Sequence, residues 1–114
     1  MTNYENRHTP ETGPREPTLS LDEAKAVVAT KTAPRVTEEF MKSRIKNVDY
    51  LYFGQLTICI ITHVNGFMVN GQSAPASANN FDGEVGKRYA YDNAFKQLWP
   101  LEGFALRETL SRAL

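Results

Sequence analysis

The chain has 114 residues, with 13 basic and 13 acidic side chains and a formal net charge of zero at neutral pH. This length predicts one small domain, and the balanced charge argues against a protein that grips nucleic acid through its overall field. A single cysteine, Cys59, excludes an intramolecular disulfide and a cysteine-based metal cluster.

Membrane and export signals are also missing from the sequence. The longest apolar run, residues 56–64, falls well short of the roughly 20 residues that a membrane-spanning helix needs. Residues 1–17 lack the apolar segment of a secretory signal. We therefore expect a protein that works in a reducing cytoplasm, without a membrane partner.

The N-terminal third divides into two segments. Residues 1–18 are polar and carry three prolines, so we expect a flexible arm that cannot bury enough apolar surface to order itself. Residues 19–34 predict a short helix and a linker. Ser20 and Glu23 have the spacing of a capping box, and Pro34 ends the segment. Residues 35–114 are expected to form a single α+β domain.

That domain is expected to open with a helix over residues 36–46, followed by strands. Thr37 suits the helix N-cap. Residues 48–54, 56–64 and 67–71 are rich in β-branched and aromatic residues. The Asn65-Gly66 pair between the last two predicts a hairpin with a type I′ turn, which aligns His63 with Met68. Gly71 is expected to end or bulge the last strand.

Two helices are expected to complete the domain. The first covers roughly residues 82–98, starts at Asp82, and presents its buried side chains at the i, i+3, i+4 and i+7 spacing. The second begins near Pro100, because proline is tolerated in a first turn. The predicted fold class is α+β: a small antiparallel sheet of three to four strands with a central hairpin, packed by two to four helices.

The segment NNFDGEVGKRYAYDNA, residues 79–94, carries the densest set of candidate binding residues. It is not a P-loop, because Phe81 stands where the first glycine is required and Arg88 follows Lys87. Its charges at positions 84, 88, 92 and 96 alternate in sign and predict an ion-pair ladder on an exposed helix. A glycine inside a helix is costly, so Gly86 indicates a close approach by a second helix, another subunit or a ligand.

Catalytic chemistry is not indicated. Cys59 lies in the middle of a strand and is best explained as a small core residue. His63 adjoins the hairpin turn, and no serine or aspartate is placed by the sequence to orient it. Nothing assembles a nucleophile, a base and an oxyanion site, so we predict no enzyme, no catalytic residue, no metal and no cofactor.

Three stretches together resemble a known family. They are VTEEFMKSRIKNVDY, TICIITHVNGFMVNGQSA and NNFDGEVGKRYAYDNAFKQLWPLEGF, and the resemblance spans about residues 36–106. It is to a family of small tailed-phage proteins, typified by gene product forty-nine of a coliphage and gene sixty-six of a Shigella phage. Pro75 departs from the pattern, since members often carry a cysteine there.

The resemblance implies a phage gene product in the host cytoplasm. The chain is also similar in character to Thoeris anti-defence protein one, a small oligomer that sequesters cyclic-ADP-ribose-like and cyclic-nucleotide signals without cleaving them. That similarity implies counter-defence by sequestration of a nucleotide-derived signal. Lys87, Arg88 and Arg107 would then meet phosphate charge, and Phe81 or Tyr91 would stack on a base.

Two other functions remain open on the sequence. The chain could be a phage accessory protein that binds a host or phage protein through its helical surface. Nucleic-acid binding is disfavoured by the balanced charge, and would show an affinity that falls steeply with salt. A core of about 80 residues is marginal by itself, so we also expect a homo-oligomer.

Overall fold

The computed structural model describes residues 12–113 and forms two compact units, Met1–Ala33 and Pro34–Leu114. Most of the expected arm, residues 1–18, lies outside the described residues. Each unit is considered by itself below.

The first unit contains the predicted capped helix, α1 (Leu21–Ala29). The Glu23 amide donates to Ser20 Oγ at 3.1 Å, and the Ser20 amide donates to Glu23 Oε1 at 2.8 Å. These two bonds form the expected capping box and hold the pKa of Glu23 below its ordinary value. No residue of α1 is buried, and its large apolar side chains, Leu21, Val27 and Val28, are exposed.

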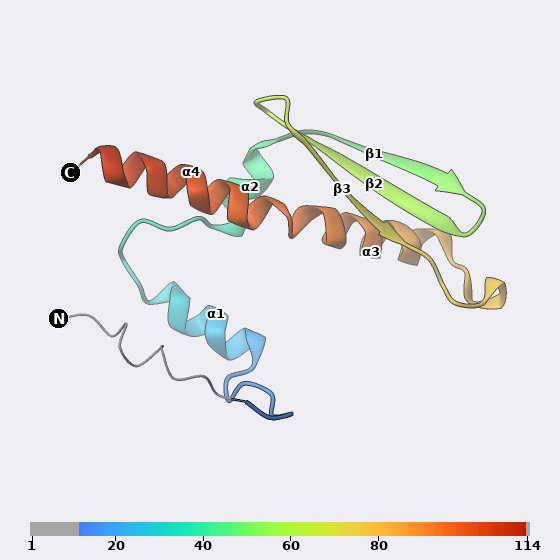
Figure 1. Ribbon diagram of the computed structural model, residues 1–114, viewed down its shortest axis with the longest axis horizontal. Helices are drawn as coiled ribbons and strands as arrows, with labels where there is room; N and C mark the ends of the chain where they lie inside the picture. Colours follow the sequence, from blue (N-terminus) through green and yellow to red (C-terminus); the bar gives the residue numbers. More distant parts are fainter. Residues whose placement is uncertain (1–11, 114) are drawn as a thin grey trace. The chain divides into compact units, whose positions relative to one another are not determined.

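The second unit is an α+β arrangement, as predicted (Figure 1). Its three antiparallel strands follow the order β1-β2-β3. The elements in chain order are α2 (Glu38–Ser43), β1 (Ile45–Phe53), β2 (Leu56–His63), β3 (Met68–Ser73), the 3-10 turn η2 (Ala78–Asn80), α3 (Gly83–Phe95) and α4 (Leu98–Arg112).

Helix α2 is shorter than predicted. Thr37 caps it as expected, accepting a bond from the Phe40 amide at 3.0 Å. The predicted helix continued to residue 46, but Ile45 already pairs with His63 in the sheet. The apolar spacing that favoured a longer helix therefore belongs partly to β1, and Ile45 packs on the core as a strand residue.

The hairpin turn is one residue longer than predicted. The amide of His63 donates to the carbonyl of Phe67, and Thr62 faces Met68. Among non-glycine residues described here none has a positive φ, whereas Gly66 has φ of 93°, so the turn is not type I′. The side chain of Asn65 stabilises the three-residue loop by accepting from the Phe67 amide at 2.9 Å.

This one-residue difference decides which side chains of β3 are buried. Val69 pairs with Ile61 and is buried, while Met68 points to the other face and is exposed. The predicted register would have exchanged the two, because successive strand residues point to opposite faces.

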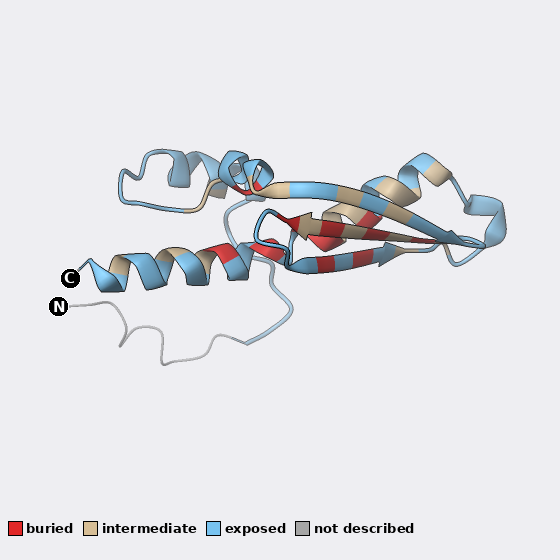
Figure 2. Cartoon of the chain, turned by 90° about the horizontal axis from the view of Figure 1, so that it is seen from above, coloured by how far each residue is buried: buried red, intermediate tan, exposed pale blue. Residues whose placement is uncertain are grey.

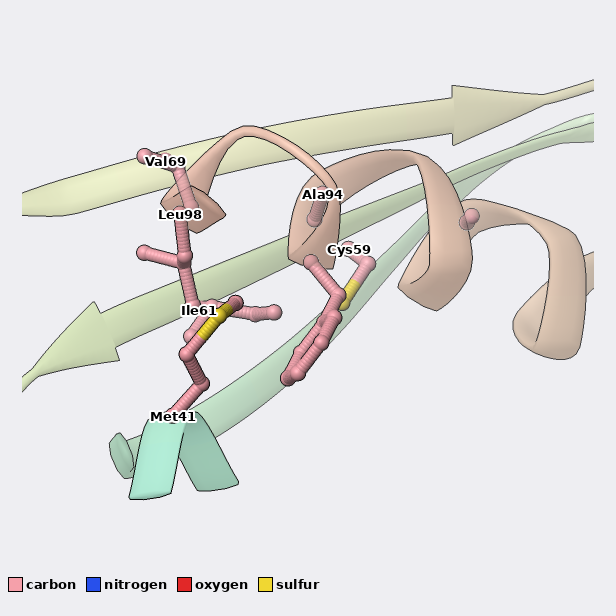
Figure 3. Close-up of a cluster of buried hydrophobic side chains, with 8 residues drawn as sticks. Met41, Cys59, Ile61, Val69, Ala94 and Leu98 are labelled. Carbon is pink, nitrogen blue, oxygen red and sulfur yellow. The ribbon is translucent and has the colours of Figure 1, made fainter. Parts of the chain in front are cut away.

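The covered face of the sheet packs against α3 with very little space between them (Figure 3). Gly71 lies inside β3, paired with Cys59, and neither ends nor bulges the strand, contrary to prediction. A Cβ at Gly71 would lie 2.2 Å from the backbone nitrogen of Ala94. Glycine at 71 and alanine at 90 and 94 thus let the backbones of helix and strand meet.

The close approach at Gly86 is also made by the sheet. A Cβ at this position would lie 2.8 Å from Oγ1 of Thr57, a fully buried residue of β2. The Thr57 hydroxyl has no hydrogen-bond partner among the described residues. Neither a second helix nor a ligand is needed to explain this glycine.

The other face of the sheet is open. Strand β2 alternates between buried and half-buried residues, and Figure 2 shows this as alternating red and tan along the strand. No helix or strand within residues 34–113 covers the second face (Figure 1). We call this surface the open face; it is defined by the alternate paired positions 47, 49, 51, 53, 56, 58, 60, 62, 68, 70 and 72.

Candidate functional site

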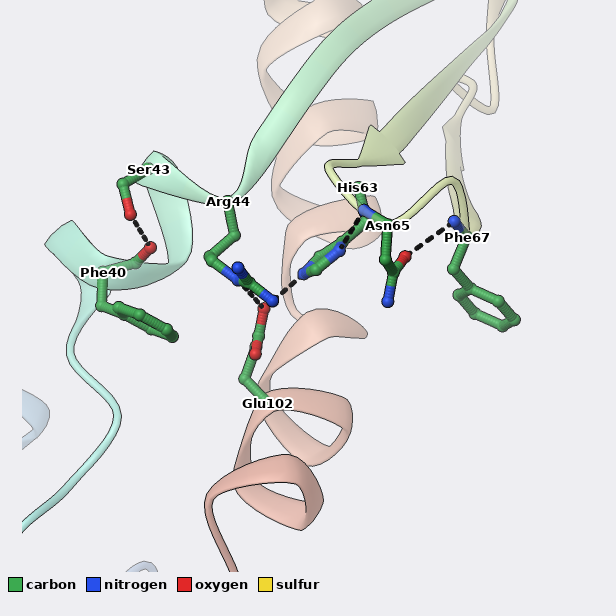
Figure 4. Close-up of polar contacts among 7 residues, drawn as sticks. All are labelled: Phe40, Ser43, Arg44, His63, Asn65, Phe67 and Glu102. Atoms are coloured by element: carbon green, nitrogen blue, oxygen red, sulfur yellow. Dashed lines mark hydrogen bonds and ion pairs between the residues drawn. The ribbon is translucent and has the colours of Figure 1, made fainter. Parts of the chain in front are cut away.

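A cluster of three ionisable side chains lies where the hairpin meets α4 (Figure 4). His63 Nε2 lies 2.5 Å from Glu102 Oε2, and Arg44 Nε lies 3.6 Å from the same oxygen. Both His63 and Glu102 are buried, with 6% of their surface exposed. A buried carboxylate is tolerated only when it is paired, so this cluster ties three elements together.

The proton on His63 can be assigned from its neighbours. The amide of Asn65 donates to His63 Nδ1 at 3.1 Å, so Nδ1 carries no proton. The ring proton is therefore on Nε2, from which it is donated to Glu102. The hairpin turn thus fixes both the orientation and the tautomer of the ring.

Local structure explains why these residues meet. Glu102 follows Leu98 by four residues on α4, and both lie on the buried stripe of that helix. Arg44 is the C-cap of α2, and its carbonyl accepts from the Val64 amide at 2.8 Å. The end of α2 and the end of β2 are thereby held together.

A groove opens beside this cluster between α2 and α4. Its volume is about 350 Å³, within the usual range for small-molecule sites. It is lined by Arg35, Val36, Phe40, Arg44, Glu102, Ala105, Leu106 and Thr109. A second hollow of about 250 Å³ shares Arg44, Glu102 and Ala105 and is bounded by the hairpin residues His63, Asn65 and Phe67. We call the first hollow the α2/α4 groove.

The α2/α4 groove combines positive charge with an aromatic ring. Two guanidinium groups, those of Arg35 and Arg44, line it, against one carboxylate that is already bound by His63. The Arg44 guanidinium lies over the ring of Phe40, 5.6 Å from its centroid. Two guanidinium groups beside an exposed ring suit a ligand that carries both a phosphate and a flat base.

Residues 36–110 match the family described as Phage protein (N4 Gp49/phage Sf6 gene 66). The chain belongs to this phage protein family. Comparison with curated proteins and with solved structures returned no match. The α2/α4 groove lies almost entirely inside the matched segment, with Arg35 directly before it.

Three of the predicted ligand-binding residues of the phage protein share one flank of α3. Arg88 lies over the ring of Tyr91, 5.3 Å from its centroid, and Lys87 lies over the ring of Tyr50 at the same distance. Each cation is also paired within its own helix, Arg88 with Asp92 and Lys87 with Glu84 at 3.7 Å. The Arg88–Asp92 pair belongs to the predicted ladder, and it raises the pKa of Arg88.

The ring of Tyr91 packs against neighbouring side chains of the protein, which leaves less of the ring free to stack on a base. Its ring stacks on Phe95 at 5.7 Å, and it packs against the core. Burial raises the pKa of its hydroxyl, although Lys42 and Arg88 act in the opposite direction.

The other two predicted residues lie elsewhere. Phe81 lines a hollow of about 210 Å³ at the start of α3, together with Val85, Gly86 and Tyr89. No lysine or arginine is among its lining residues. Arg107 is exposed on α4, beyond Glu102, and is not a lining residue of the α2/α4 groove. The five predicted residues therefore do not meet in one described hollow.

The α2/α4 groove was missed by the sequence analysis, although one signal for it existed. The apolar stripe of residues 91, 94, 95 and 98 continues by four residues to Glu102. A carboxylate on a buried stripe indicates a buried partner. His63 was identified as a candidate without a partner, and Glu102 is that partner.

Two absences hold for the described part of the phage protein. No group of three or more histidine, cysteine, aspartate or glutamate residues within it could hold a metal ion. None of its helices is long and apolar enough to cross a bilayer.

Proposed function

We propose that this phage protein is a non-catalytic binder that holds a nucleotide-derived, phosphate-bearing signalling molecule in the α2/α4 groove. Sequestration of such a signal, of the cyclic-nucleotide or cyclic-ADP-ribose type, would serve counter-defence in the host cytoplasm. The observation that carries the proposal is the pairing of Arg35 and Arg44 with the Phe40 ring around one groove.

The geometry favours an anion over a neutral ligand. Among residues 12–113, Arg35 forms no ion pair, so its charge is available to a ligand. Arg44 is already oriented by Glu102 and by Phe40, which lowers the entropy lost when it binds a phosphate. The ring of Phe40 is 46% exposed and offers a stacking surface.

The same geometry favours binding over catalysis. Both ring nitrogens of His63 are engaged, one with the Asn65 amide and one with Glu102, so the ring has no free nitrogen to act as a base. Cys59 is fully buried, and burial raises the pKa of its thiol, which disfavours the nucleophilic thiolate. We therefore expect the bound molecule to be recovered unchanged.

Titration calorimetry with a panel of cyclic dinucleotides and cyclic ADP-ribose isomers tests the proposal. We expect one member to bind, and Arg35→Ala to weaken it by about tenfold or more, because a hydrogen-bonded charge contributes about 1.5–3 kcal/mol. Arg107→Ala is the matched control, since it removes an exposed arginine outside the groove. Equal losses in both variants, or no binding of any member, would contradict the proposal.

The site predicted from the sequence can be tested in the same titration. Lys87→Ala and Arg88→Ala remove cations that already have helical partners. If the ligand binds the flank of α3, these variants will lose affinity while Arg35→Ala will not. If affinity falls steeply with salt for any polynucleotide added instead, the protein binds nucleic acid.

A protein partner is the second candidate function, and one observation favours it. Phe81, Val85 and Tyr89 are exposed large apolar side chains that line the same hollow at the start of α3. Solvent-exposed apolar clusters of this kind often mark protein interfaces. Tyr89→Ala should then abolish recovery of one stoichiometric partner from infected cells, while Arg35→Ala should not.

A further inference from the structure

The open face of the sheet is far more apolar than a solvent-facing sheet surface. Its central strand presents Leu56, Ile58 and Ile60 in succession. Leu51 and Phe53 of β1 and Met68 of β3 flank them, with 42%, 63% and 62% of their surfaces exposed. An antiparallel sheet with one solvated face normally alternates apolar and polar residues, and these strands do not.

We propose that the open face binds the open face of a second copy, forming a two-fold symmetric β-sandwich dimer. This inference is independent of the α2/α4 groove, which lies on the helical side of the sheet. Two sheets that pack face to face bury side chains from both inner faces in a common core. The net charge of the chain is zero, so two copies approach without overall repulsion.

The polar residues on the open face indicate how the two copies are oriented. Asp49 of β1 and Asn70 of β3 flank the same residue, Ile60, on opposite sides of β2. A two-fold axis parallel to the strands places β1 of one copy over β3 of the other. Asp49 then faces the partner's Asn70, whose amide can donate to the carboxylate.

This orientation also places apolar side chains against apolar side chains at the centre of the interface. The axis runs along β2, so Ile58 and Ile60 lie over the same residues of the second copy. Asp49 is the one charged residue among the paired open-face positions, and Asn47 already donates to it at 2.9 Å. The dimer therefore has an apolar centre along β2, and its margin combines apolar side chains with the hydrogen bond between Asp49 and the partner's Asn70.

The size of the face sets the expected strength. With strands about 4.8 Å apart and about 3.3 Å per residue, three strands of six or seven residues present roughly 300 Å² in projection. Two such faces total roughly 600 Å² in projection, below the about 1,200 Å² of stable specific interfaces and in the class of weak, transient ones. We therefore expect a dissociation constant in the micromolar range, measurable by sedimentation of the full chain.

Two phenylalanines provide a matched test. Phe53 on the open face and Phe104 on α4 are 63% and 67% exposed, so neither is needed for the core. Phe53→Glu should raise the dimer dissociation constant at least about tenfold, whereas Phe104→Glu should leave it within about twofold. A full chain that sediments as a monomer up to several hundred micromolar overturns the proposal. The open face would then bind something other than a second copy. Loss of the dimer only in Phe104→Glu would place the interface on the helices.

The orientation has its own test. Asn70→Asp places a carboxylate opposite the partner's Asp49, and should raise the dissociation constant about fivefold or more through like-charge repulsion. Asp49→Asn in the same chain should restore it to within about twofold of the original. If the second change gives no recovery, the strands of the two copies cross differently and the parallel axis is wrong.

Discussion

The two faces of the sheet are built on different principles. The covered face meets α3 through small residues, Gly71 of the sheet and Ala90 and Ala94 of the helix, so that backbone meets backbone. Its central residues, Cys59 and Ile61, are fully buried. The open face carries larger side chains, but none of them is fully buried within the unit. The difference teaches that the sheet is stabilised mainly by close contact with α3. Its other surface leaves apolar side chains partly exposed to solvent within the unit.

The largest expected effect is at Gly71. Gly71→Ala places a Cβ 2.2 Å from the Ala94 nitrogen and 2.5 Å from the Ala90 carbonyl oxygen, both of them backbone atoms that cannot rotate away. We expect a loss of at least about 3 kcal/mol in the free energy of unfolding, measured by urea denaturation. Gly103→Ala is the matched control, because a Cβ there meets nothing within 4 Å. Similar midpoints for both variants would contradict a backbone-to-backbone packing.

The second prediction compares two isoleucines of one strand. Ile61 is fully buried under α3, whereas Ile58 is half-buried on the open face. Ile61→Ala should cost about 3 kcal/mol and Ile58→Ala about 1 kcal/mol at low protein concentration, because only the first leaves a closed cavity. If the loss at Ile58 grows as protein concentration rises, the open face is covered by a second copy.

A smaller effect is expected at Gly86. Gly86→Ala gains about 1 kcal/mol of helix propensity but brings a Cβ to 2.8 Å from the Thr57 hydroxyl. The two terms nearly cancel, so the free energy of unfolding should change by less than about 1 kcal/mol. The same change made together with Thr57→Ala should show favourable coupling in a double-mutant cycle. Additive effects would mean that the two residues do not touch.

The smallest effect concerns Cys59 and pH. Burial raises the pKa of its thiol, so the folded state disfavours the thiolate. The stability from this residue is fully present below the unfolded pKa, about 8.5, and is lost as pH rises toward the folded pKa. We expect a decline of a few tenths of a kcal/mol between about pH 8 and pH 9, absent in Cys59→Ala. A decline of equal size in that variant would assign it to other groups.

The parts of the fold that local rules determine were predictable from the sequence. The caps at Ser20, Thr37 and Asp82 were predicted from residue type and spacing, and the structure confirms all three. The three strands and the order of the helices followed from apolar periodicity in the same way. The family was also identified correctly from its motifs.

Most of what failed depended on interactions between residues distant in the sequence, and the hairpin turn is the local exception. The turn type at Asn65 was wrong because the side chain of Asn65 stabilises a longer loop, which no dipeptide preference contains. The role of Gly71 was wrong because it depends on α3, about 20 residues later. The α2/α4 groove was missed because Arg35, Arg44 and Glu102 meet only after the chain has folded. The binding role assigned to Phe81, Lys87, Arg88, Tyr91 and Arg107 stays a prediction.

The position of Glu102 has a consequence for the groove it lines. Within the described part of α4, Leu98 and Glu102 are the buried residues, and nothing after Glu102 is buried. One wall of the groove is formed by Ala105, Leu106 and Thr109. These residues follow Glu102 on α4, so they lie beyond the point where the bond to His63 anchors the helix. This wall is held by few packed side chains, whereas Arg44 is held by Glu102. If the groove binds the proposed ligand, we expect selectivity to depend on where the ligand carries its charge, and much less on its size.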